Sequence, residues 1–363
     1  MNLIILLIAV TLILIIYMLV RVRKLLLSTS EKGFEKEILE PVDVTRKSQR
    51  VNGALLLGFL IVGIIAVVWS AVAASDDFLP PAVSVHGAAV DNMTLVTLII
   101  TGLVFFVTQI ALFYFSFRYR KRKNTTAFYF PINYRIEIIW TVIPAITFAS
   151  LFILGSKTSQ EIYEAPPDDA VTIEIVGQQF SWMTRYPGED GKLGDYDFRL
   201  IDAGNPLGLN LADEAVFDDF MPMQIVVPKN RAVELKIRSR DVIHSVFLPH
   251  FRVKMDAVPG MPTRFKFIPT TTTEEMRRKL NNPDFNYELA CAELCGRGHF
   301  AMKFILRVVE EEEYREWYAS QVPWLAKNPG YLRNAPEELR TKAYQLITKY
   351  DSIPKLSQNS VQP

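Results

Sequence analysis

The stretch Cys291–Met302, which reads CAELCGRGHFAM, decides how the rest of this 363-residue chain is interpreted. It contains both cysteines of the chain, one of its four histidines and a methionine. Thiolate, imidazole and thioether groups are soft ligands, and together they suit copper better than calcium, magnesium or manganese. We therefore take this stretch as a candidate metal-binding loop.

Three other arrangements compete for the pair Cys291 and Cys295. The pair could form a disulfide, because the flanking chain is expected outside the cytoplasm, where disulfides persist. It could lie on one face of a helix, since positions 291, 295 and 299 repeat every four residues, but Gly296 and Gly298 favour a loop. It could bind zinc, which accepts cysteine and histidine but rarely methionine. The cysteines alone indicate a disulfide and a metal site equally well, and the nearby histidine and methionine favour the metal.

A second histidine should come from elsewhere in the chain. His244 lies in Asp241–Pro249, an apolar strand-like run that reads DVIHSVFLP. A lone histidine in such a run is more often a satisfied core residue than a ligand, so its case rests on the combination. A copper site with one cysteine is typically His2Cys with a weak axial methionine. Two cysteines are enough for two sulfur bridges between two coppers.

These residues resemble subunit II of the haem–copper cytochrome c oxidases, whose cupredoxin domain carries the dinuclear CuA centre. The loop meets the family pattern C-x-E-x-C-x-x-x-H-x-x-M in full, and Asp241–Ser245 meets the upstream pattern D-V-x-H-S. Lys254–Gly260 is similar to the family segment K-x-D-x-x-P-G. The resemblance covers roughly residues 135–318.

The resemblance implies a role for each ligand. Cys291 and Cys295 would bridge both coppers, and His244 and His299 would each bind one copper. Met302 would be a weak axial ligand to one of the two ions.

The resemblance also assigns two roles to Glu293. Its main-chain carbonyl would be the axial ligand to the other copper, and its side chain would bind a magnesium shared with the catalytic subunit. The chain has no C-x-x-C-H motif, so we expect no covalently attached c-type haem on it. Such a chain would accept electrons from cytochrome c and pass them to the haem-bearing subunit I, for O2 reduction coupled to proton pumping.

Four apolar stretches before this domain predict membrane-spanning helices: 3–20, 51–74, 93–117 and 134–155. The first could be a signal peptide. No basic residue precedes its apolar core and no small-residue cleavage site follows it, so we expect a retained anchor. The mixed-charge stretch Glu31–Arg50 is expected to form a short surface helix.

The charges of the loops predict the orientation of the spans. Arg118–Lys123 has five basic residues and no acid, whereas Asp76–Asn92 has three acids and no lysine or arginine. Basic loops stay in the cytoplasm. We therefore expect a multi-pass protein of the bacterial inner (plasma) membrane, with its copper domain on the periplasmic side. In the outer loop, His86 is expected to be a solvated residue.

From Ala170 onward the pattern predicts short strands, and hence an all-β, cupredoxin-like Greek-key barrel. Apolar and polar residues largely alternate in Val171–Val176, Val233–Arg238 and Arg264–Ile268, and strands are expected on both sides of the metal loop, at 287–290 and 303–309. We divide the chain into a transmembrane region (1–157), a copper domain (158–310) and a polar, partly helical tail (311–363). Two insertions, 186–223 and 270–286, are expected to be solvated surface, the second with a short helix at 274–280.

Glu137 stands near the start of the last predicted span. An acid so close to the membrane costs free energy unless it faces protein or water. It could be an interfacial helix-start residue in favourable contact with the helix dipole. The resemblance implies another role, because E-x-x-W-T-x-x-P, met here by 137–144, recurs in the family with the acid at the mouth of a proton pathway.

The chain departs from the family where electrons are expected to enter. Relatives usually have G-H-Q-W-x-W, whose first tryptophan receives electrons from cytochrome c, but Gly177–Trp182 reads GQQFSW. Phe180 therefore replaces that tryptophan, and Trp182 is the second one. Arg240 stands where many relatives carry an acid that attracts a basic cytochrome. Our hypothesis is a cytochrome domain tethered by a partner complex, unless the acidic run Asp213–Asp219 folds beside the site and restores the attraction.

Three other function classes are alternatives to an oxidase subunit II. A quinol oxidase subunit keeps the fold but lacks the copper ligands, which are all present here. An anchored copper-handling cupredoxin needs neither four spans nor the Glu137 segment. The CuA subunit of a nitrogen-oxide reductase is excluded less firmly. A formal net charge of +1 gives no indication of nucleic-acid binding.

Overall fold

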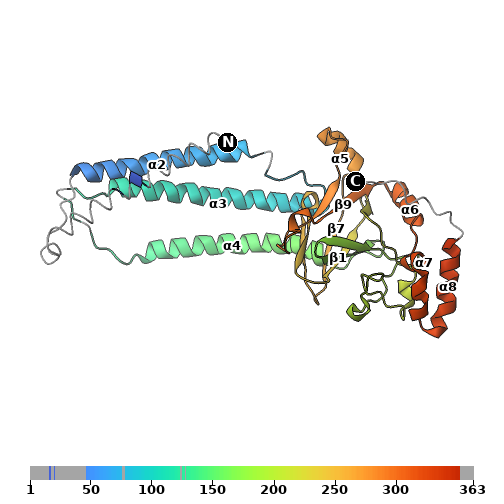
Figure 1. Cartoon of the computed structure of the whole chain (residues 1–363). Helices are drawn as coiled ribbons and strands as arrows, with labels where there is room; N and C mark the ends of the chain where they lie inside the picture. The colour runs from blue at the N-terminus through green and yellow to red at the C-terminus, as the bar shows by residue number, and fades with distance from the viewer. Residues whose placement is uncertain are drawn as a thin grey trace. The chain divides into compact units, whose positions relative to one another are not determined.

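A computed structural model describes residues 46–351, except 76, 77, 123, 124 and 127, together with Ile16, Tyr17 and Val20. The chain divides into two compact units, which comprise residues 1–68 with 106–129, and residues 69–105 with 130–363 (Figure 1). Apart from those three positions, the predicted span 3–20 lies outside the described residues. The surface helix expected at 31–50 lies outside them up to residue 45.

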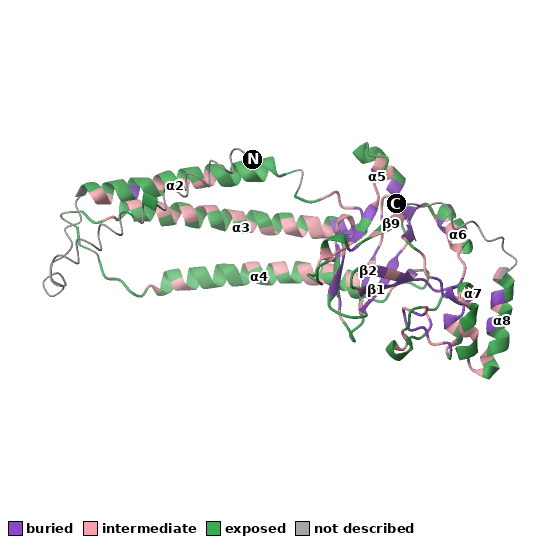
Figure 2. Cartoon of the chain, in the orientation of Figure 1, coloured by how far each residue is buried: buried purple, intermediate pink, exposed green. Residues whose placement is uncertain are grey.

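Three long helices contain the other predicted spans: α2 (Arg46–Ala73), α3 (Val85–Arg118) and α4 (Tyr134–Tyr163). In the described part of the chain, these three are long and apolar enough to cross a membrane. Their apolar side chains are largely exposed, as the green and pink ribbons of Figure 2 show. Helices that are apolar all round are stable in lipid rather than in water. The chain is therefore membrane-anchored through them.

Nine strands follow in the described residues, and they form a two-sheet sandwich. The strands are β1 (Val171–Gln178), β2 (Ser181–Arg185), β3 (Ile225–Pro228), β4 (Val233–Ser239), β5 (His244–Leu248), β6 (Val253–Ala257), β7 (Thr263–Phe267), β8 (Tyr287–Cys291) and β9 (Lys303–Val309). One sheet has the order β2-β1-β4-β7 and the other the order β3-β9-β8-β5-β6. Because the chain passes repeatedly between the sheets, this is the Greek-key, cupredoxin-like fold that the sequence predicts.

The sandwich is held together by apolar side chains that alternate along its strands. In β1 and β4 these side chains are the first, third and fifth residues, and in β5 they are the third and fifth. They pack into one core with residues of β8 and β9, and all are less than 5% exposed. The core includes Val171, Ile173, Ile175, Val233, Leu235, Ile237, Val246, Leu248, Tyr287, Leu289, Leu306 and Val308.

The opposite side of the first sheet is charged, yet it is also buried. The Glu174 carboxylate lies 2.8 Å from Arg185 and 2.8 Å from Arg238, and Arg185 lies 2.9 Å from Asp219. Burial would raise the pKa of Glu174, but the two guanidinium groups hold it below its usual value. Burial raises the pKa of Asp219, and Arg185 beside it opposes the rise. In β1, apolar and polar residues alternate, yet both faces of the strand are covered and neither is solvated.

The insertion 186–223 provides this cover, so the expectation that it is solvated surface is wrong. It contains η1 (Phe198–Leu200) and η2 (Glu214–Val216) and packs against the tail, which forms α6 (Glu311–Ala319), α7 (Trp324–Lys327), η5 (Pro329–Asn334) and α8 (Glu337–Asp351). Together they build a second hydrophobic cluster with β1: Val176, Leu207, Leu209, Leu211, Val216, Phe217, Trp324, Leu325, Ala335, Ala343 and Ile347.

The second insertion contains α5 (Thr273–Leu280), the short helix that the sequence predicts. Thr272 and Glu275 form a capping box at its start. The expectation for His86 is wrong, because α3 begins before it. His86 is buried in the first turn of this helix, with its ring centroid 5.5 Å from that of Phe265. Charge patterning alone did not distinguish a solvated loop from a helix that rises out of the membrane.

We predict that Glu174→Gln lowers the free energy of unfolding of the β-domain by about 3–5 kcal/mol, because it leaves two buried guanidinium groups without their shared anion. Urea titration followed by tryptophan fluorescence measures this change. The control is Glu288→Gln, which breaks an exposed pair with Lys303 and should cost about 1 kcal/mol or less. Equal losses in the two variants would show that the buried network contributes no more than a surface pair.

Candidate metal centre

Two neighbouring strands and one loop bring the predicted ligands together. His244 is the first residue of β5, and Cys291 is the last residue of β8. The two strands are antiparallel, with Val246 opposite Cys291, so the histidine and the cysteine lie at the same end of the sandwich. Residues 292–302 then return from β8 to β9, and within them η4 (His299–Ala301) turns the loop toward this end.

The ligand atoms lie within a few ångströms of one another. The two Sγ atoms of Cys291 and Cys295 are 3.9 Å apart. Nδ1 of His244 is 3.9 Å from Sγ of Cys291, and Nδ1 of His299 is 3.6 Å from Sγ of Cys295. Sδ of Met302 is 3.9 Å from Sγ of Cys295. Each imidazole therefore presents its Nδ1 to a different sulfur, and the thioether stands beside one of the two.

This geometry decides between the arrangements that the cysteine pair left open. Both cysteines are free, and 3.9 Å is far beyond the ~2.05 Å of a disulfide bond. They lie on a strand end and a loop, not on the face of an α-helix. Sulfurs that share one metal at about 2.3 Å can be no more than ~4.6 Å apart, and these sulfurs satisfy that limit. The donor set fits copper, because zinc rarely takes a thioether.

Part of the centre is shielded from solvent, whereas Cys291 and His299 are only partly buried. His244 is 0% exposed, Met302 1% and Cys295 5%. Burial, and the neighbouring thiol of Cys291, raise the pKa of the Cys295 thiol to about 11. Since metals bind the thiolate, loading of this site releases protons to the surroundings.

Three residues outside the loop orient His244. Asp241 Oδ1 lies 2.9 Å from Nε2 of the imidazole, which leaves Nδ1 for the sulfurs. Partial burial alone would raise the pKa of Asp241, but hydrogen bonds from the Gln179 N–H and from His244 hold it below its usual value. At Gly177, a Cβ atom would lie 2.8 Å from Cδ2 of the imidazole, so only glycine allows this approach. The i−3 spacing of Asp241 was a usable signal, whereas Gln179 and Gly177 act through tertiary contact.

The loop itself is held by Gln179, whose side-chain Nε2 donates to the carbonyl of Cys295 at 2.7 Å. The carbonyl of Glu293 lies 3.2 Å from Sγ of Cys291, and its side chain is exposed. The two predicted roles of Glu293 therefore use two different parts of the residue. The structure brings one of these parts, the main-chain carbonyl, close to Sγ of Cys291.

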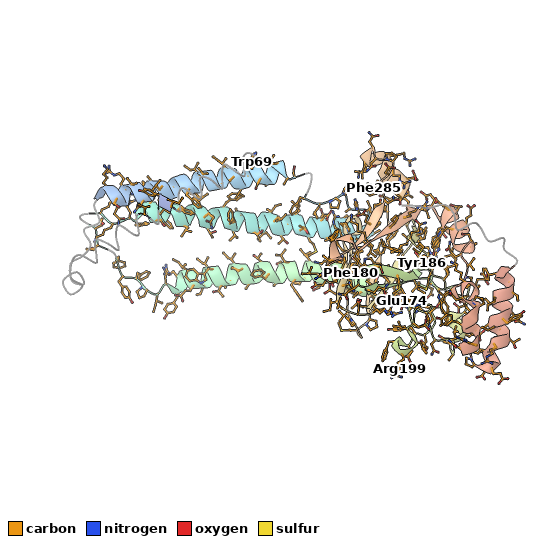
Figure 3. All side chains as sticks on the ribbon, in the orientation of Figure 1. Trp69, Glu174, Phe180, Tyr186, Arg199 and Phe285 are labelled. Carbon is orange, nitrogen blue, oxygen red and sulfur yellow. The ribbon has the colours of Figure 1, made fainter. Side chains whose placement is uncertain are left out.

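Phe180 and Trp182 make different contacts near the centre. Trp182 is 3% exposed, and its ring centroid is 5.8 Å from that of His244. Phe180, which Figure 3 labels, follows β1 at the turn to β2. Its side chain is 40% exposed. Its ring lies on the loop, where Cβ atoms at Gly296 and Gly298 would come within 2.9 Å and 2.5 Å of it. Gly296 also has φ +133°, which side chains rarely adopt.

Glu137 belongs to a separate place in the molecule. It lies in the first turn of α4, 26 residues before Tyr163 (163 − 137), which is roughly 40 Å along the helix axis. Its Oε1 accepts the Asn133 N–H at 3.3 Å, and the Asn133 side chain in turn accepts from the N–H of Ile136. Glu137 therefore has a helix-capping contact, which does not preclude a second role.

The acidic run Asp213–Asp219 is engaged inside its own insertion. Asp213 caps η2, and Glu214 pairs with Lys342. Asp218 accepts the Asp190 N–H, and Asp219 pairs with the buried Arg185. We therefore do not assign it to donor docking. Arg240 is exposed, and its guanidinium donates to Oε1 of Gln178 at 2.8 Å.

Comparison with known proteins gives consistent results. Residues 171–309 match the family model "Cytochrome C oxidase subunit II, periplasmic domain", and residues 59–155 match "Cytochrome C oxidase subunit II, transmembrane domain". The chain is 34% identical over 234 residues to the alternative cytochrome c oxidase subunit 2 of Bradyrhizobium diazoefficiens, covering 64% of this chain and 80% of the relative. It is 30% identical over 265 residues to the probable cytochrome c oxidase subunit 2 of Rickettsia prowazekii, covering 73% and 76%.

A solved structure, the periplasmic domain of subunit II of cytochrome oxidase of Bradyrhizobium japonicum, is 27% identical to the chain. The match covers 43% of this chain and 96% of that one, with a TM-score of 0.30.

We predict that the purified chain binds two copper ions and shows an EPR pattern from one electron shared between them, because two thiols and two imidazoles are available together. Metal analysis by mass spectrometry and EPR spectroscopy test this. Cys291→Ser should remove the shared-electron pattern, whereas Ser245→Ala, beside a ligand but not among the ligands, should keep it. A one-copper spectrum, or an intact pattern in Cys291→Ser, contradicts the prediction.

Proposed function

Because the chain belongs to the cytochrome c oxidase subunit II family, we propose that it accepts electrons at a dinuclear copper centre and passes them to the haem-bearing subunit I. That subunit would reduce O2 and pump protons. The observation that carries the proposal is the pair of free thiols 3.9 Å apart, each with its own imidazole Nδ1. The proposal places this domain on the periplasmic side of a bacterial inner membrane.

The residues divide the work of holding the centre. Cys291, Cys295, His244 and His299 would hold the two coppers, and Met302 beside Cys295 would complete the donor set. When bound, two coppers that share one electron through two thiolates supply electron transfer with little change of geometry. The chain's own contribution is rigidity, since the imidazoles, the thiols and the loop are each held by neighbours before any metal arrives.

We assign two functions to Glu293. Its carbonyl, 3.2 Å from Sγ of Cys291, would complete the ligand set. Its exposed side chain is available to a magnesium shared with the catalytic subunit, because carboxylates suit that hard cation. We assign no haem to this chain.

The alternative functions have less support. A quinol oxidase subunit would lack the ligand set that the structure assembles at one end of the sandwich. The relatives described above are named as cytochrome c oxidase subunits, and neither is named as a nitrogen-oxide reductase or a copper-handling protein. Membership of a haem–copper oxidase complex accounts for both the membrane helices and the metal centre.

The donor is proposed to be a cytochrome domain held by a partner complex, not a strongly basic soluble cytochrome c. Phe180 replaces an indole at the exposed edge of the copper loop. Arg240 is a cation whose guanidinium donates to Gln178, two residues before Phe180. Asp241 is engaged by Gln179 and His244. A cation at position 240, where an attracting acid would be needed, weakens electrostatic steering, and tethering restores a high local donor concentration.

We predict that Glu137→Gln slows steady-state turnover of the assembled oxidase several-fold while reduction of copper by the donor stays fast. The reason is that the acid at the mouth of a proton pathway would limit proton uptake and not electron uptake. Oxygen consumption and stopped-flow copper reduction measure the two steps. Glu161→Gln, the same change at the other end of α4, is the matched control. Unchanged turnover in Glu137→Gln would leave this residue with its capping contact alone.

We also predict that turnover with a highly basic cytochrome c is slow and depends only weakly on ionic strength, because Arg240 stands where an attracting acid would be needed. Arg240→Glu should raise turnover at low salt and steepen its salt dependence. The exposed Arg199→Glu is the control for a charge change elsewhere on the surface. Fast wild-type turnover that collapses with salt would rule out this view of the donor.

A further inference from the structure

The segment that precedes α3 is bonded into the β-domain before the helix turns into the membrane. Val83 donates its N–H to the carbonyl of His250 at 2.8 Å and accepts from the N–H of Thr270 at 2.8 Å. Val85, the first residue of α3, donates to the carbonyl of Ile268 at 3.1 Å. The N-terminal end of α3 therefore adjoins the β-domain through these backbone bonds (Figure 1).

One side chain closes this joint. Arg252, whose side chain is 8% exposed, makes two contacts with the carboxylate of Asp91 in α3, at 2.7 Å and 2.9 Å. Its remaining donors reach the carbonyl of Pro249 at 2.6 Å and the carbonyl of Pro80 at 2.7 Å. Backbone strain marks the same residue, because φ is +56° where glycine or asparagine would be favoured.

The joint and the metal centre lie at opposite ends of one hairpin. Strands β5 and β6 pair from Leu248 opposite Val253 at the closed end to His244 opposite Ala257 at the open end. Arg252 lies in the turn at the closed end, and the copper ligand His244 lies at the open end, about 13 Å away along the strand. β5 also pairs with β8, which carries Cys291. A rigid displacement of the turn would therefore carry the ligands with it as one unit, without changing their mutual geometry.

The second helix next to the domain is attached through a different set of contacts. α4 ends at Tyr163, whose carbonyl accepts from Arg264 at 2.9 Å. Glu164 pairs with Lys266 at 2.8 Å, but the Glu164 side chain is 63% exposed. Both helices extend eight residues past the predicted spans toward the domain (93 to 85, and 155 to 163), about 12 Å each. The Asp91–Arg252 pair on the α3 side is the less exposed of the two ion pairs, since its side chains are 32% and 8% exposed against 63% and 12% for Glu164 and Lys266.

We infer that the Asp91–Arg252 pair is a positioning element that fixes the metal centre at a set distance and angle from the membrane, and hence from the electron acceptor in the partner subunit. The inference rests on the proposed function. Electron transfer requires donor and acceptor to be held in register, and a small misplacement far from the reacting centre can be costly. Removing one partner leaves a buried charge uncompensated at the joint, so the joint loosens while the ligand loop stays intact.

The test uses the assembled oxidase with Asp91→Asn and, separately, Arg252→Lys. We expect wild-type copper content, a wild-type EPR pattern and unchanged copper reduction by the donor. We expect a several-fold slower transfer from copper to haem after flash photolysis. Amide hydrogen exchange should speed up in residues 80–87 and stay unchanged in 289–302, which reports the joint independently of turnover. Lys266→Gln, which breaks the exposed pair on the α4 side, should leave both readouts unchanged.

Asp91→Glu keeps the charge with a longer side chain, and we expect it to recover most of the lost rate. Wild-type copper-to-haem transfer in both Asp91→Asn and Arg252→Lys overturns the inference. So does loss of the copper pattern in these variants, because the pair would then support folding of the site and not its position. Failure of the proposed function is a different result, since wild-type oxidase itself would then show no copper-to-haem transfer.

Discussion

The whole arrangement depends on two thiol groups that lie 3.9 Å apart and stay unbonded. Cys291 is fixed by the last pair of strand β8, and Cys295 by a loop whose carbonyl is held by Gln179 from another sheet. The strand and the loop therefore bring both free thiols within reach of a shared metal ion.

The parts of this site that the sequence predicts are those whose chemistry is local. Cys291, Glu293, Cys295, His299 and Met302 follow one another within twelve residues, so their spacing alone indicates a metal loop. His244 was inferred by family pattern and is brought in by strand pairing. Gln179 and Gly177 were not found, because their roles arise only when the β1–β2 turn meets the loop. No periodicity in the chain reports such a contact.

The fold shows the same division between local and tertiary signals. Alternation predicts the strands of the sandwich, and long apolar runs predict the spans. The insertion 186–223 was misjudged because its apolar residues Leu207, Leu209 and Leu211 lie in irregular structure without helix or strand periodicity. Only the partner surface of α7 and α8, more than one hundred residues later, makes them a core. Burial of Glu174 likewise depends on that cover and not on the strand that carries it.

The second hydrophobic cluster has a consequence for the biosynthesis of the chain. Ile347, which helps to cover Leu207, is 140 residues further along (347 − 207). At about 5–20 residues per second, a growing chain needs roughly 7–28 s to make that stretch. The metal loop is complete at Met302, 45 residues before Ile347 (347 − 302), so for roughly the last 2–9 s it is finished while the apolar side of the insertion still lacks its cover. The last helix to emerge is therefore what ends the exposure, and a ribosome that stops short of α8 releases a domain that has its ligands but remains prone to aggregation.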